Sequence, residues 1–273
     1  MPELPEVETV RKTLADLAIG RTIRHVSVYW PNIIKYPTVE QFQRSLQNER
    51  IEQVGRRGKF LIIYTNRWAL VSHLRMEGKY RLLPSDSPLE KHMHVVFHFT
   101  DGTELRYHDV RKFGTMHLYR KGDEWKNPPL NRLGVEPLSD DFTFQQIRSI
   151  CLSTSRKIKV VLLDQQKIAG LGNIYVDEVL YQSSIHPERA ANTLSEEEII
   201  TLHQAIQQTL QEAVKLGGTT IRTYKNTQGK IGTFQTRLLA YGRVGEQCQK
   251  CGRPIEKIKV GGRGTHICTF CQR

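Results

Sequence analysis

Apolar residues near the amino terminus recur with the spacing of an α-helix. They are separated by steps of three, four and three, and they are Val7, Val10, Leu14 and Leu17. Residues at this spacing share one face of a helix. Pro5 fits the first turn, because the N–H that proline lacks would have no partner there. The pattern therefore predicts a helix that begins close to the start of the chain.

From about residue 21 to residue 120 the apolar pattern becomes strand-like. Apolar runs flank Asn66-Arg67 and Asp101-Gly102, two dipeptides that suit turns. An Asp-Gly pair tolerates the positive φ angles of a type I′ turn, so it predicts a tight hairpin. Several short strands joined by turns predict a β-sandwich.

The pattern changes after residues 127–131, whose sequence Asn-Pro-Pro-Leu-Asn is typical of a linker. Apolar residues then recur at helical spacing around residues 144–151, and again from Ser195 onward. Ser195 followed by three glutamates is a strong helix start, and Gly217-Gly218 suits the end of that helix. The glutamates complement the positive end of the helix and are not taken as catalysts. The predicted fold class is α+β, with a β-rich first half and a helical second half.

The segment 215–234 is rich in Gly, Thr and basic residues and poor in apolar ones. It is too long for an ordinary connection between elements. It is therefore either a functional loop or a disordered one, and the pattern alone leaves both open.

The composition narrows the classes of function. The chain has 273 residues, 38% of them hydrophobic, and a net charge of +12. No apolar run approaches the ~18 residues of a membrane span, and acidic residues stand where a signal peptide carries basic ones. A cytoplasmic protein with no membrane partner is expected. The positive charge favours polyanions such as nucleic acid, although a merely basic protein would show it too.

Four of the five cysteines form two pairs near the carboxyl terminus, Cys248-x2-Cys251 and Cys268-x2-Cys271. Each pair presents two thiolates on one tight turn, and the two pairs together close a tetrahedron around Zn²⁺. Four thiolates leave no open coordination position, so one structural zinc ion is expected. Two disulfides are the alternative, and a reducing compartment disfavours them. Cys151 lies on an apolar helical face and is interpreted as a core residue.

Arg263 stands between Gly262 and Gly264, in the stretch between the two cysteine pairs. Small neighbours suit a hairpin tip and let a guanidinium approach another backbone closely. Phosphate is the natural target of such a group. A solvated turn arginine is the alternative.

The amino terminus offers a reactive group if Met1 is removed, because Pro2 then carries a secondary amine. Attack of this amine on an aldehydic carbon, such as C1′ of a deoxyribose, gives a cationic iminium and makes the C2′ proton acidic. Loss of that proton expels the 3′ phosphate, and a second elimination expels the 5′ phosphate. Glu3 is adjacent and suits a general acid and base, and Glu6, one turn on, suits holding the amine. Prolines and glutamates are also common in first helical turns, so this pattern alone decides little.

Three stretches together resemble the bacterial formamidopyrimidine-DNA glycosylase family. They are the opening Pro2-Glu3-Leu4-Pro5-Glu6-Val7-Glu8-Thr9, the stretch Gly170-Leu171-Gly172-Asn173-Ile174-Tyr175-Val176-Asp177-Glu178, and the terminal cysteines. The resemblance covers essentially the whole chain. It implies a β-sandwich catalytic domain with its amino-terminal helix over residues 1–133. A helix–two-turns–helix domain follows over 134–238, with a lesion-capping loop at 215–234, and a zinc finger hairpin over 239–273.

The resemblance also implies an activity, that of a bifunctional DNA glycosylase and AP lyase of base excision repair. Such an enzyme acts as a monomer without an organic cofactor. Its substrate is double-stranded DNA with an oxidised purine, 8-oxoguanine or a formamidopyrimidine, opposite cytosine, and it nicks the strand by β,δ-elimination. Pro2 is then the Schiff-base nucleophile and Glu3 the proton donor, while Lys59 assists the first elimination and Arg263 the second. Lys59 and Arg263 serve equally well as phosphate clamps, and the sequence does not separate these roles.

Extrusion of a base leaves a hole in the stack, which the family fills with three side chains. Met76, Arg111 and Phe113 match these positions; Arg111 and Phe113 are two residues apart, so they project from the same side of an extended segment. A core methionine and a core phenylalanine are the alternatives. The other positions implied to contact DNA are His73, His92, Lys159, Asn173 and Tyr241, of which Asn173 opens a helix whose free N–H groups suit a phosphate. The loop residues implied to close over the flipped base are Thr219, Ile221, Arg222, Thr223 and Tyr224.

Two other functions stay open. The endonuclease VIII branch of the same superfamily prefers oxidised pyrimidines, and Leu4, together with Met76, Arg111 and Phe113, favours the purine branch instead. A zinc-ribbon DNA-binding protein without catalysis would bind DNA in a salt-sensitive way and form no covalent product.

Overall fold

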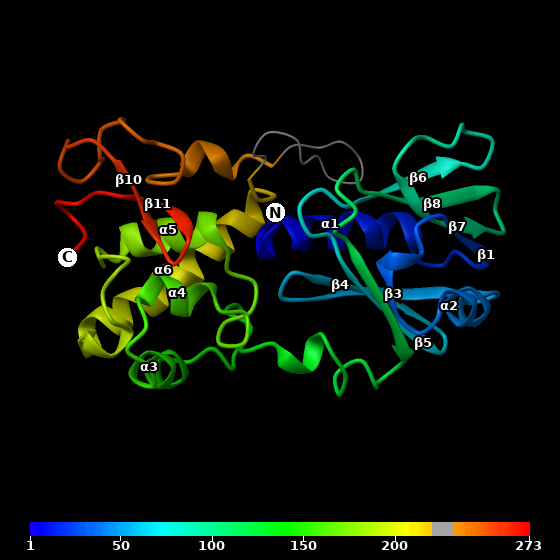
Figure 1. The fold of residues 1–273 in the computed structure, drawn as a ribbon, viewed down its shortest axis with the longest axis horizontal. Coiled ribbons are helices and arrows are strands. Elements are labelled where there is room, and N and C mark those ends of the chain that lie inside the picture. The colour runs from blue at the N-terminus through cyan, green and yellow to red at the C-terminus, as the bar shows by residue number, and fades with distance from the viewer. Residues whose placement is uncertain (220–231) are drawn as a thin grey trace. The chain divides into compact units, whose positions relative to one another are not determined.

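The computed structural model describes residues 1–219 and 232–273, which divide into two compact units. Unit 1 comprises Met1–Asn131 together with Thr219 and Gly232, and unit 2 comprises Arg132–Gly218 and Thr233–Arg273 (Figure 1). The boundary at Asn131 falls in the stretch expected to be a linker. The finer division into three domains stays a prediction. Four residues of the expected lesion loop lie outside the described residues, namely Ile221, Arg222, Thr223 and Tyr224.

Unit 1 begins with the helix that the apolar spacing predicts, α1 (Leu4–Ala18). Its buried side chains include Val7, Val10 and Leu14, which confirms the predicted face. Glu3 precedes the first helical residue and forms a capping box with Glu6. The helix packs against β3 (Ile51–Arg57) and β4 (Phe60–Thr65), and its apolar face joins the core of the unit.

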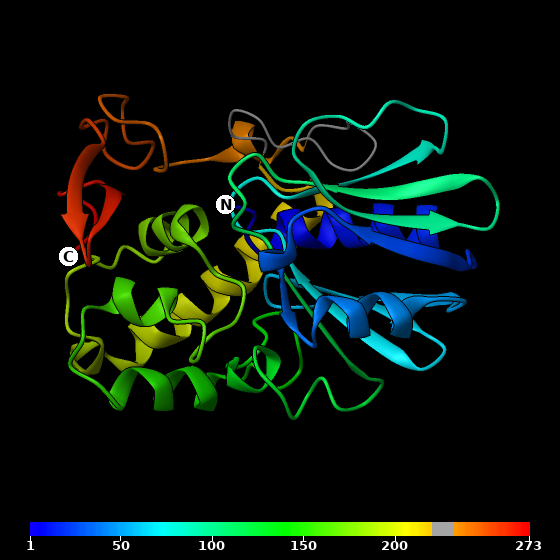
Figure 2. The same ribbon diagram turned by 45° about the vertical axis from the view of Figure 1, so that its right-hand side comes forward.

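Two β-sheets form the rest of unit 1 and appear as separate layers in Figure 2. The four-stranded sheet has the order β1–β7–β8–β6 and is built from β1 (Ile23–Val28), β6 (Lys79–Pro84), β7 (Met93–Phe99) and β8 (Thr103–His108). The five-stranded sheet has the order β2–β9–β5–β4–β3, and its further strands are β2 (Ile34–Tyr36), β5 (Trp68–His73) and β9 (Thr115–Arg120). Apolar side chains of both sheets share one core. The predicted β-sandwich is therefore confirmed.

Two local details differ from expectation. The turn between β7 and β8 has a positive φ only at Gly102 (79°), so the predicted type I′ turn, which needs two such residues, is wrong. The strand-like region also contains a helix, α2 (Val39–Leu46), which follows the 3-10 turn η1 (Pro31–Ile33) and β2. Thr38 caps α2 by accepting a hydrogen bond from the N–H of Gln41. This threonine is a local helix signal that the prediction of strands for this region did not take into account.

The strand register gathers several loops at one edge of each sheet. Phe60 pairs with His73, and His73 pairs with Thr115, so the β3–β4 turn, the end of β5 and the start of β9 lie side by side. In the other sheet, His108 pairs with both Lys79 and Met93. Loops 74–78 and 109–114 run from one sheet to the other at these edges. Most of the candidate residues of unit 1 are therefore brought to one end of the sandwich.

Unit 2 is helical, with a β-hairpin near the carboxyl terminus. The 3-10 turn η2 (Leu130–Arg132) spans the boundary between the two units. The elements of unit 2 are α3 (Phe144–Leu152), α4 (Ile158–Leu163), α5 (Asn173–Gln182), η3 (Ala191–Thr193), α6 (Glu196–Lys215), η4 (Phe234–Arg237), β10 (Glu256–Val260) and β11 (Arg263–Ile267). Ser195 and Glu198 form a capping box at the start of α6, and Gly217 and Gly218, both with positive φ, follow its end, as predicted. Cys151 is buried in the core of this unit. In the described part of the chain, no helix is long and apolar enough to cross a bilayer.

Candidate active site

The start of α1 is buried and its polar groups hydrogen-bond to one another. Pro2 and Glu3 are both buried. The Glu3 N–H donates to Glu6 Oε2 at 2.9 Å, and the other oxygen of Glu6 accepts from the Thr219 N–H at 2.7 Å and from its hydroxyl at 3.1 Å. Glu6 therefore fixes the backbone of Glu3 and the predicted loop residue Thr219. Because Met1 is present, the Pro2 nitrogen is an amide here, and the expected contact between Glu6 and a free amine is not tested.

Helix α1 begins near the turn that carries Lys59 and runs away from it. Glu8 accepts from Arg56 at 3.2 Å, and one turn further on Arg11 donates to the Val54 carbonyl at 3.3 Å. Because the helix residue number rises as the strand number falls, the start of α1 lies toward the far end of β3, where Gly58 and Lys59 form the turn into β4. The two ribbons agree with this direction in Figure 1. Burial would raise the pKa of Glu8, but hydrogen bonds and charges of Arg11 and Arg56 outweigh it and leave the pKa below its usual range.

Lys59 and His73 belong to one buried group at this end of the sheet. Lys59 is only 5% exposed, which is unusual for a lysine. Burial lowers the pKa of His73 to about 3, and the charges of Arg75 and Lys59 add to this effect. The His73 Nδ1 accepts the Arg75 N–H at 2.9 Å, and the ring meets Phe60 edge-on at 4.5 Å. His73 is therefore a neutral, fixed ring at working pH, with Nε2 carrying its proton.

Met76 and Phe113 are exposed apolar side chains on the two crossing loops. Met76 is 39% exposed and Phe113 is 51% exposed, which excludes the alternative of core residues for both. Arg111 is also exposed, and its guanidinium carbon lies 5.0 Å from the centre of the Phe113 ring. The two side chains therefore project together, but the segment is not extended as expected, because Lys112 between them has a φ of 57°. An exposed methionine and phenylalanine rimmed by arginine suit contact with another molecule.

Asp109 holds loop 109–114 from inside, and the sequence analysis missed it. Its carboxylate is fully buried and accepts three backbone N–H groups, from Arg111 at 3.0 Å, Phe113 at 2.9 Å and Gly114 at 2.8 Å. An aspartate that bonds the N–H two residues ahead is a known turn-forming pattern, so a local signal was present. Asp109 therefore presets the loop that presents Arg111 and Phe113.

His92 lies beside this loop in a left-handed backbone conformation, with φ of 69°. Its carbonyl accepts the Asp109 N–H at 3.1 Å, and its half-buried ring lies 6.5 Å from the His94 ring and 6.0 Å from the His108 ring. The structure thus places His92 at the same end of the sandwich as His73, with part of its ring accessible.

In unit 2, Arg263 is exposed and immediately follows a tight turn. Gly261 and Gly262 form the turn between β10 and β11 with φ of 55° and 78°, which L side chains rarely adopt. A Cβ on Gly261 would also lie 2.6 Å from Val160 of α4, so glycine is required there for space as well. Among the described residues Arg263 forms no ion pair, which leaves its guanidinium available for an outside anion.

A buried polar network connects the hairpin β10–β11 to helices α4 and α5. Lys159 is fully buried, and its ammonium donates to Asp177 at 2.5 Å and to the Gly264 carbonyl at 3.3 Å. The other Asp177 oxygen accepts the N–H and the ring nitrogen of His266, both at 2.9 Å. The network anchors β11 to α4 and α5. The burial of Lys159 does not support the direct DNA contact expected of it and points to a supporting role instead.

Asn173 and Tyr241 meet the same hairpin. Asn173 is the first residue of α5, and its amide donates to the Gly264 carbonyl at 2.9 Å. The Tyr241 ring packs edge-on against His266 at 4.7 Å. Their side chains therefore lie with Arg263 on one part of unit 2, which sequence spacing alone did not reveal.

Glu178 fixes the segment that leads into the cysteine cluster. It is fully buried and accepts the N–H groups of Leu239 at 2.8 Å, Ala240 at 2.9 Å and Tyr241 at 2.7 Å. Burial raises the pKa of Glu178, while the three donors work in the opposite direction. Partners 61 to 63 residues away leave no local signal in the sequence.

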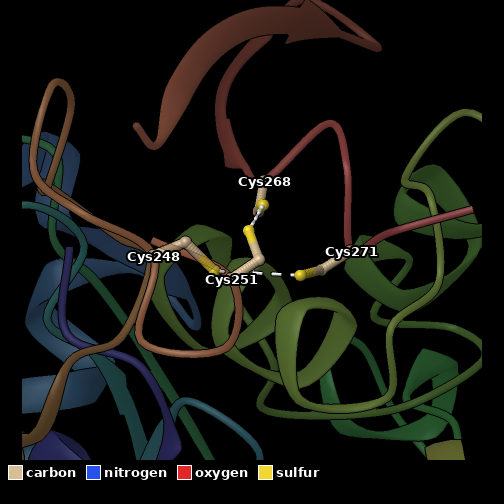
Figure 3. Close-up of side chains that lie close together, drawn as sticks. All are labelled: Cys248, Cys251, Cys268 and Cys271. Carbon is tan, nitrogen blue, oxygen red and sulfur yellow. Dashed lines mark hydrogen bonds between the residues drawn. The ribbon is translucent and has the colours of Figure 1, made fainter. Parts of the chain in front are cut away.

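The four predicted cysteine ligands come together (Figure 3). Their sulfur atoms all lie within 4.8 Å of one another, with Cys248 and Cys271 at 3.9 Å and Cys251 and Cys268 at 3.5 Å. A tetrahedron with Zn–S bonds of ~2.3 Å requires sulfur atoms roughly 3.8 Å apart, so the cluster fits a structural zinc ion. All four are free thiols, which rules out the two-disulfide alternative. The Tyr181 hydroxyl lies 3.2 Å from Cys248 Sγ and links α5 to the cluster.

The candidate residues thus form two groups. Unit 1 contains Pro2, Glu3, Glu6, Lys59, His73, Met76, His92, Arg111, Phe113 and Thr219. Unit 2 contains Lys159, Asn173, Tyr241, Arg263 and the four cysteines. Each group is assembled within its own unit. The first combines a buried chain start with exposed apolar side chains, and the second combines an exposed arginine with a metal cluster.

Comparisons with known proteins agree along the whole chain. Residues 1–116 match the formamidopyrimidine-DNA glycosylase N-terminal domain, residues 133–225 the formamidopyrimidine-DNA glycosylase H2TH domain, and residues 245–273 a zinc finger found in FPG and IleRS. The formamidopyrimidine-DNA glycosylase of Bacillus licheniformis is 56% identical over 274 residues, which cover all of both chains.

Solved structures show the same similarity. A Lactococcus lactis FPG variant in complex with a Fapy-dG containing DNA matches with a TM-score of 0.94 and 45% identity, over all of both chains. The Lactococcus lactis Fpg in complex with an abasic site containing DNA matches with a TM-score of 0.93 and 45% identity, over 99% of each chain.

Proposed function

Because the chain belongs to the formamidopyrimidine-DNA glycosylase family, we propose that it is a bifunctional DNA glycosylase and AP lyase that removes oxidised purines through the amine of Pro2. The observation that carries this proposal is the buried start of α1, where Glu6 holds the backbone N–H of Glu3, next to Pro2, toward the Lys59 turn. The relatives were solved with damaged and abasic DNA, which is the matching class of substrate. From the family membership we also expect the protein to act as a monomer in the bacterial cytoplasm.

The chemistry begins when Met1 is removed and the Pro2 amine becomes free. The amine attacks C1′, the bond from C1′ to the damaged base breaks, and the base leaves with the bonding pair and takes up a proton. Glu3 supplies a proton to the ring oxygen as the sugar opens, which leaves an iminium between Pro2 and C1′. A buried amine beside the positive end of a helix is held in its unprotonated, nucleophilic form.

Strand cleavage follows from the iminium. Loss of a C2′ proton sends electrons to the iminium and expels the 3′ phosphate, and a second elimination expels the 5′ phosphate. We assign assistance of the first step to Lys59, which is buried at the turn beside His73. We assign binding of the second phosphate as it leaves to Arg263, which is exposed beside its glycine turn. Water then hydrolyses the imine and frees the amine. No step requires an organic cofactor.

Binding of the damaged duplex uses the remaining candidates. We assign Met76, Arg111 and Phe113 to the gap left by the extruded purine, opposite cytosine, because they are exposed and project from neighbouring loops. We assign His92, Asn173 and Tyr241 to the DNA-binding surfaces of their units, beside the buried His73, and a supporting role to the buried Lys159. We assign the lesion-capping role to the predicted loop residues, of which only Thr219 lies within the described part of the chain; the others are Ile221, Arg222, Thr223 and Tyr224. A structural Zn²⁺ in the cysteine cluster holds the hairpin of Arg263.

Borohydride trapping tests the reaction. Reduction during the reaction with an 8-oxoguanine:cytosine duplex converts the iminium into a stable amine, so a covalent protein–DNA complex is expected. A chain with one extra residue ahead of Pro2 is the control, since its proline nitrogen is an amide; it should bind the duplex and form no complex. Salt-sensitive binding without any covalent product would instead identify a non-catalytic zinc-ribbon protein.

Substrate preference is tested with matched duplexes that carry 8-oxoguanine or thymine glycol at one position. We expect faster excision of the purine. A clear preference for the pyrimidine would place the protein with the endonuclease VIII branch.

A further inference from the structure

A buried tyrosine lies between the two loops that carry the exposed side chains of unit 1. Tyr107 is the penultimate residue of β8 and is fully buried, and its ring meets Tyr80 edge-on at 5.1 Å. A Cβ built on Gly78 would lie 2.1 Å from the Tyr107 hydroxyl oxygen, and one built on Gly114 would lie 1.9 Å from it. The oxygen is therefore in contact with loop 74–78 on one side and loop 109–114 on the other.

Each loop is otherwise fixed by its own hydrogen bonds at the glycine. The Gly78 N–H donates to the Leu74 carbonyl at 2.9 Å, and the Gly114 N–H donates to Asp109 at 2.8 Å. Real Cβ atoms essentially never approach another heavy atom within 3.0 Å, so any larger residue at either position would displace the loop or the tyrosine. Two glycines 36 residues apart thus leave room for one hydroxyl group, which sets the distance between the loops.

We propose that Tyr107 is a positioning residue for insertion into the base stack. By holding the two loops at a fixed separation, it fixes the spacing between Met76 on one loop and Phe113 on the other, whose side chains are exposed. Tyr107 itself is too deeply buried to touch DNA, so it acts only through these loops. The inference rests on the proposed function, because the loops need a fixed spacing only if they enter DNA together.

The substitution Tyr107→Phe tests this spacing. It removes the atom of Tyr107 that lies nearest to both glycines and keeps the ring that fills the core. We expect single-turnover excision from an 8-oxoguanine:cytosine duplex to fall by about 10- to 100-fold, since misplacement by ~1 Å is enough for such losses. Cleavage of a single-stranded oligonucleotide that already holds an abasic site should stay unchanged, because no stack has to be entered.

Tyr80→Phe is the matched control. Tyr80 faces Tyr107 across the sheet and donates to the Ser72 hydroxyl at 2.8 Å, away from both glycines. It loses a buried hydroxyl as Tyr107→Phe does, so it should keep the ratio of duplex to single-strand rates. An equal loss on both substrates in Tyr107→Phe, or the same ratio change in Tyr80→Phe, would overturn the proposal.

A rescue experiment covers the case in which Tyr107→Phe folds poorly. Gly114→Ala should lower the duplex rate, because its Cβ collides with the Tyr107 hydroxyl and ring. Adding Tyr107→Leu shortens the opposing side chain, so the double variant should react with the duplex faster than Gly114→Ala alone. A double variant no faster than Gly114→Ala would contradict the spacing role. If the unmodified protein cleaves neither substrate, it is the proposed function that fails.

Discussion

The start of α1 and the hairpin β10–β11 both carry candidate catalytic groups, and they hold them in opposite ways. Pro2 and Glu3 are buried, with Glu6 hydrogen-bonded around them. Arg263 is exposed, and the buried polar groups lie beneath it, around Asp177. The difference follows the chemistry. Burial favours the unprotonated form of an amine that has to attack one carbon atom. A guanidinium that binds a phosphate has to be exposed, and it is positioned best when the backbone beneath it is fixed.

The largest effect is expected where the hairpin depends on metal. Cys248→Ser removes one of four thiolates, and structural zinc contributes roughly 10 kcal/mol to the folding of a finger. We predict less than one zinc ion per chain by metal analysis, and at least a ~100-fold loss of affinity for lesion duplex, because Arg263 loses its support. Cys151→Ser is the control, since burial raises the pKa of that thiol to about 11 and it lies outside the cluster. Full zinc content in Cys248→Ser would contradict the ligand assignment.

The second prediction concerns the base of the hairpin. Asp177→Asn leaves the fully buried Lys159 ammonium without its charge partner, and breaking a buried ion pair costs about 3–5 kcal/mol. Urea unfolding should show this loss. The double variant Lys159→Met with Asp177→Leu removes both charges and should recover most of it. If Asp177→Asn leaves the free energy of unfolding unchanged, the network does not support β11.

The third prediction concerns unit 1 and the pH dependence that His73 gives to its stability. The pKa of His73 is about 3 in the folded protein and ~6.5 in the unfolded chain, so the unfolded state binds the extra proton between these values. Stability should therefore fall as pH falls, by about 2–3 kcal/mol between pH 7 and pH 4.5. Urea unfolding at both pH values measures this. His73→Gln should show a smaller fall, and an unchanged pH slope in that variant would show that His73 is not the cause.

The smallest effect is expected at Glu6. Glu6→Gln keeps one acceptor oxygen but turns the other into a donor, so one side facing Glu3 or Thr219 loses its hydrogen bond, at a cost of about 1–2 kcal/mol. The borohydride-trapping rate should fall ~10-fold, because the backbone beside Pro2 is less well fixed. Glu40→Gln, which also changes a glutamate in the first turn of a helix, is the control. If Glu40→Gln lowers the trapping rate more than Glu6→Gln does, Glu6 has no specific role in the reaction.

Local features of the fold could be predicted from the sequence, because their causes lie within a few residues. The spacing of Val7, Val10 and Leu14 gave α1, and Ser195 with Gly217 marked the ends of α6. Helix α2 was missed even though Thr38 caps it, since β-branched and aromatic neighbours favoured strands.

The candidate site was predicted only in part, for the same reason. The CxxC spacing was sufficient for the cysteine cluster. Glu178, Asp177 and Glu6 each accept a backbone N–H from a residue 61 to 213 positions away, and no local pattern reports these contacts. Burial of Lys159 is likewise a property of packing, and the resemblance had implied a DNA contact for it instead.

The most direct test of the central claim is peptide mapping of the borohydride-reduced complex by mass spectrometry. We predict that the sugar remnant is attached to the amino-terminal peptide, at the nitrogen of Pro2, with Met1 absent. Attachment to Lys59 or another lysine, or an active protein that retains Met1, would contradict Pro2 as the nucleophile.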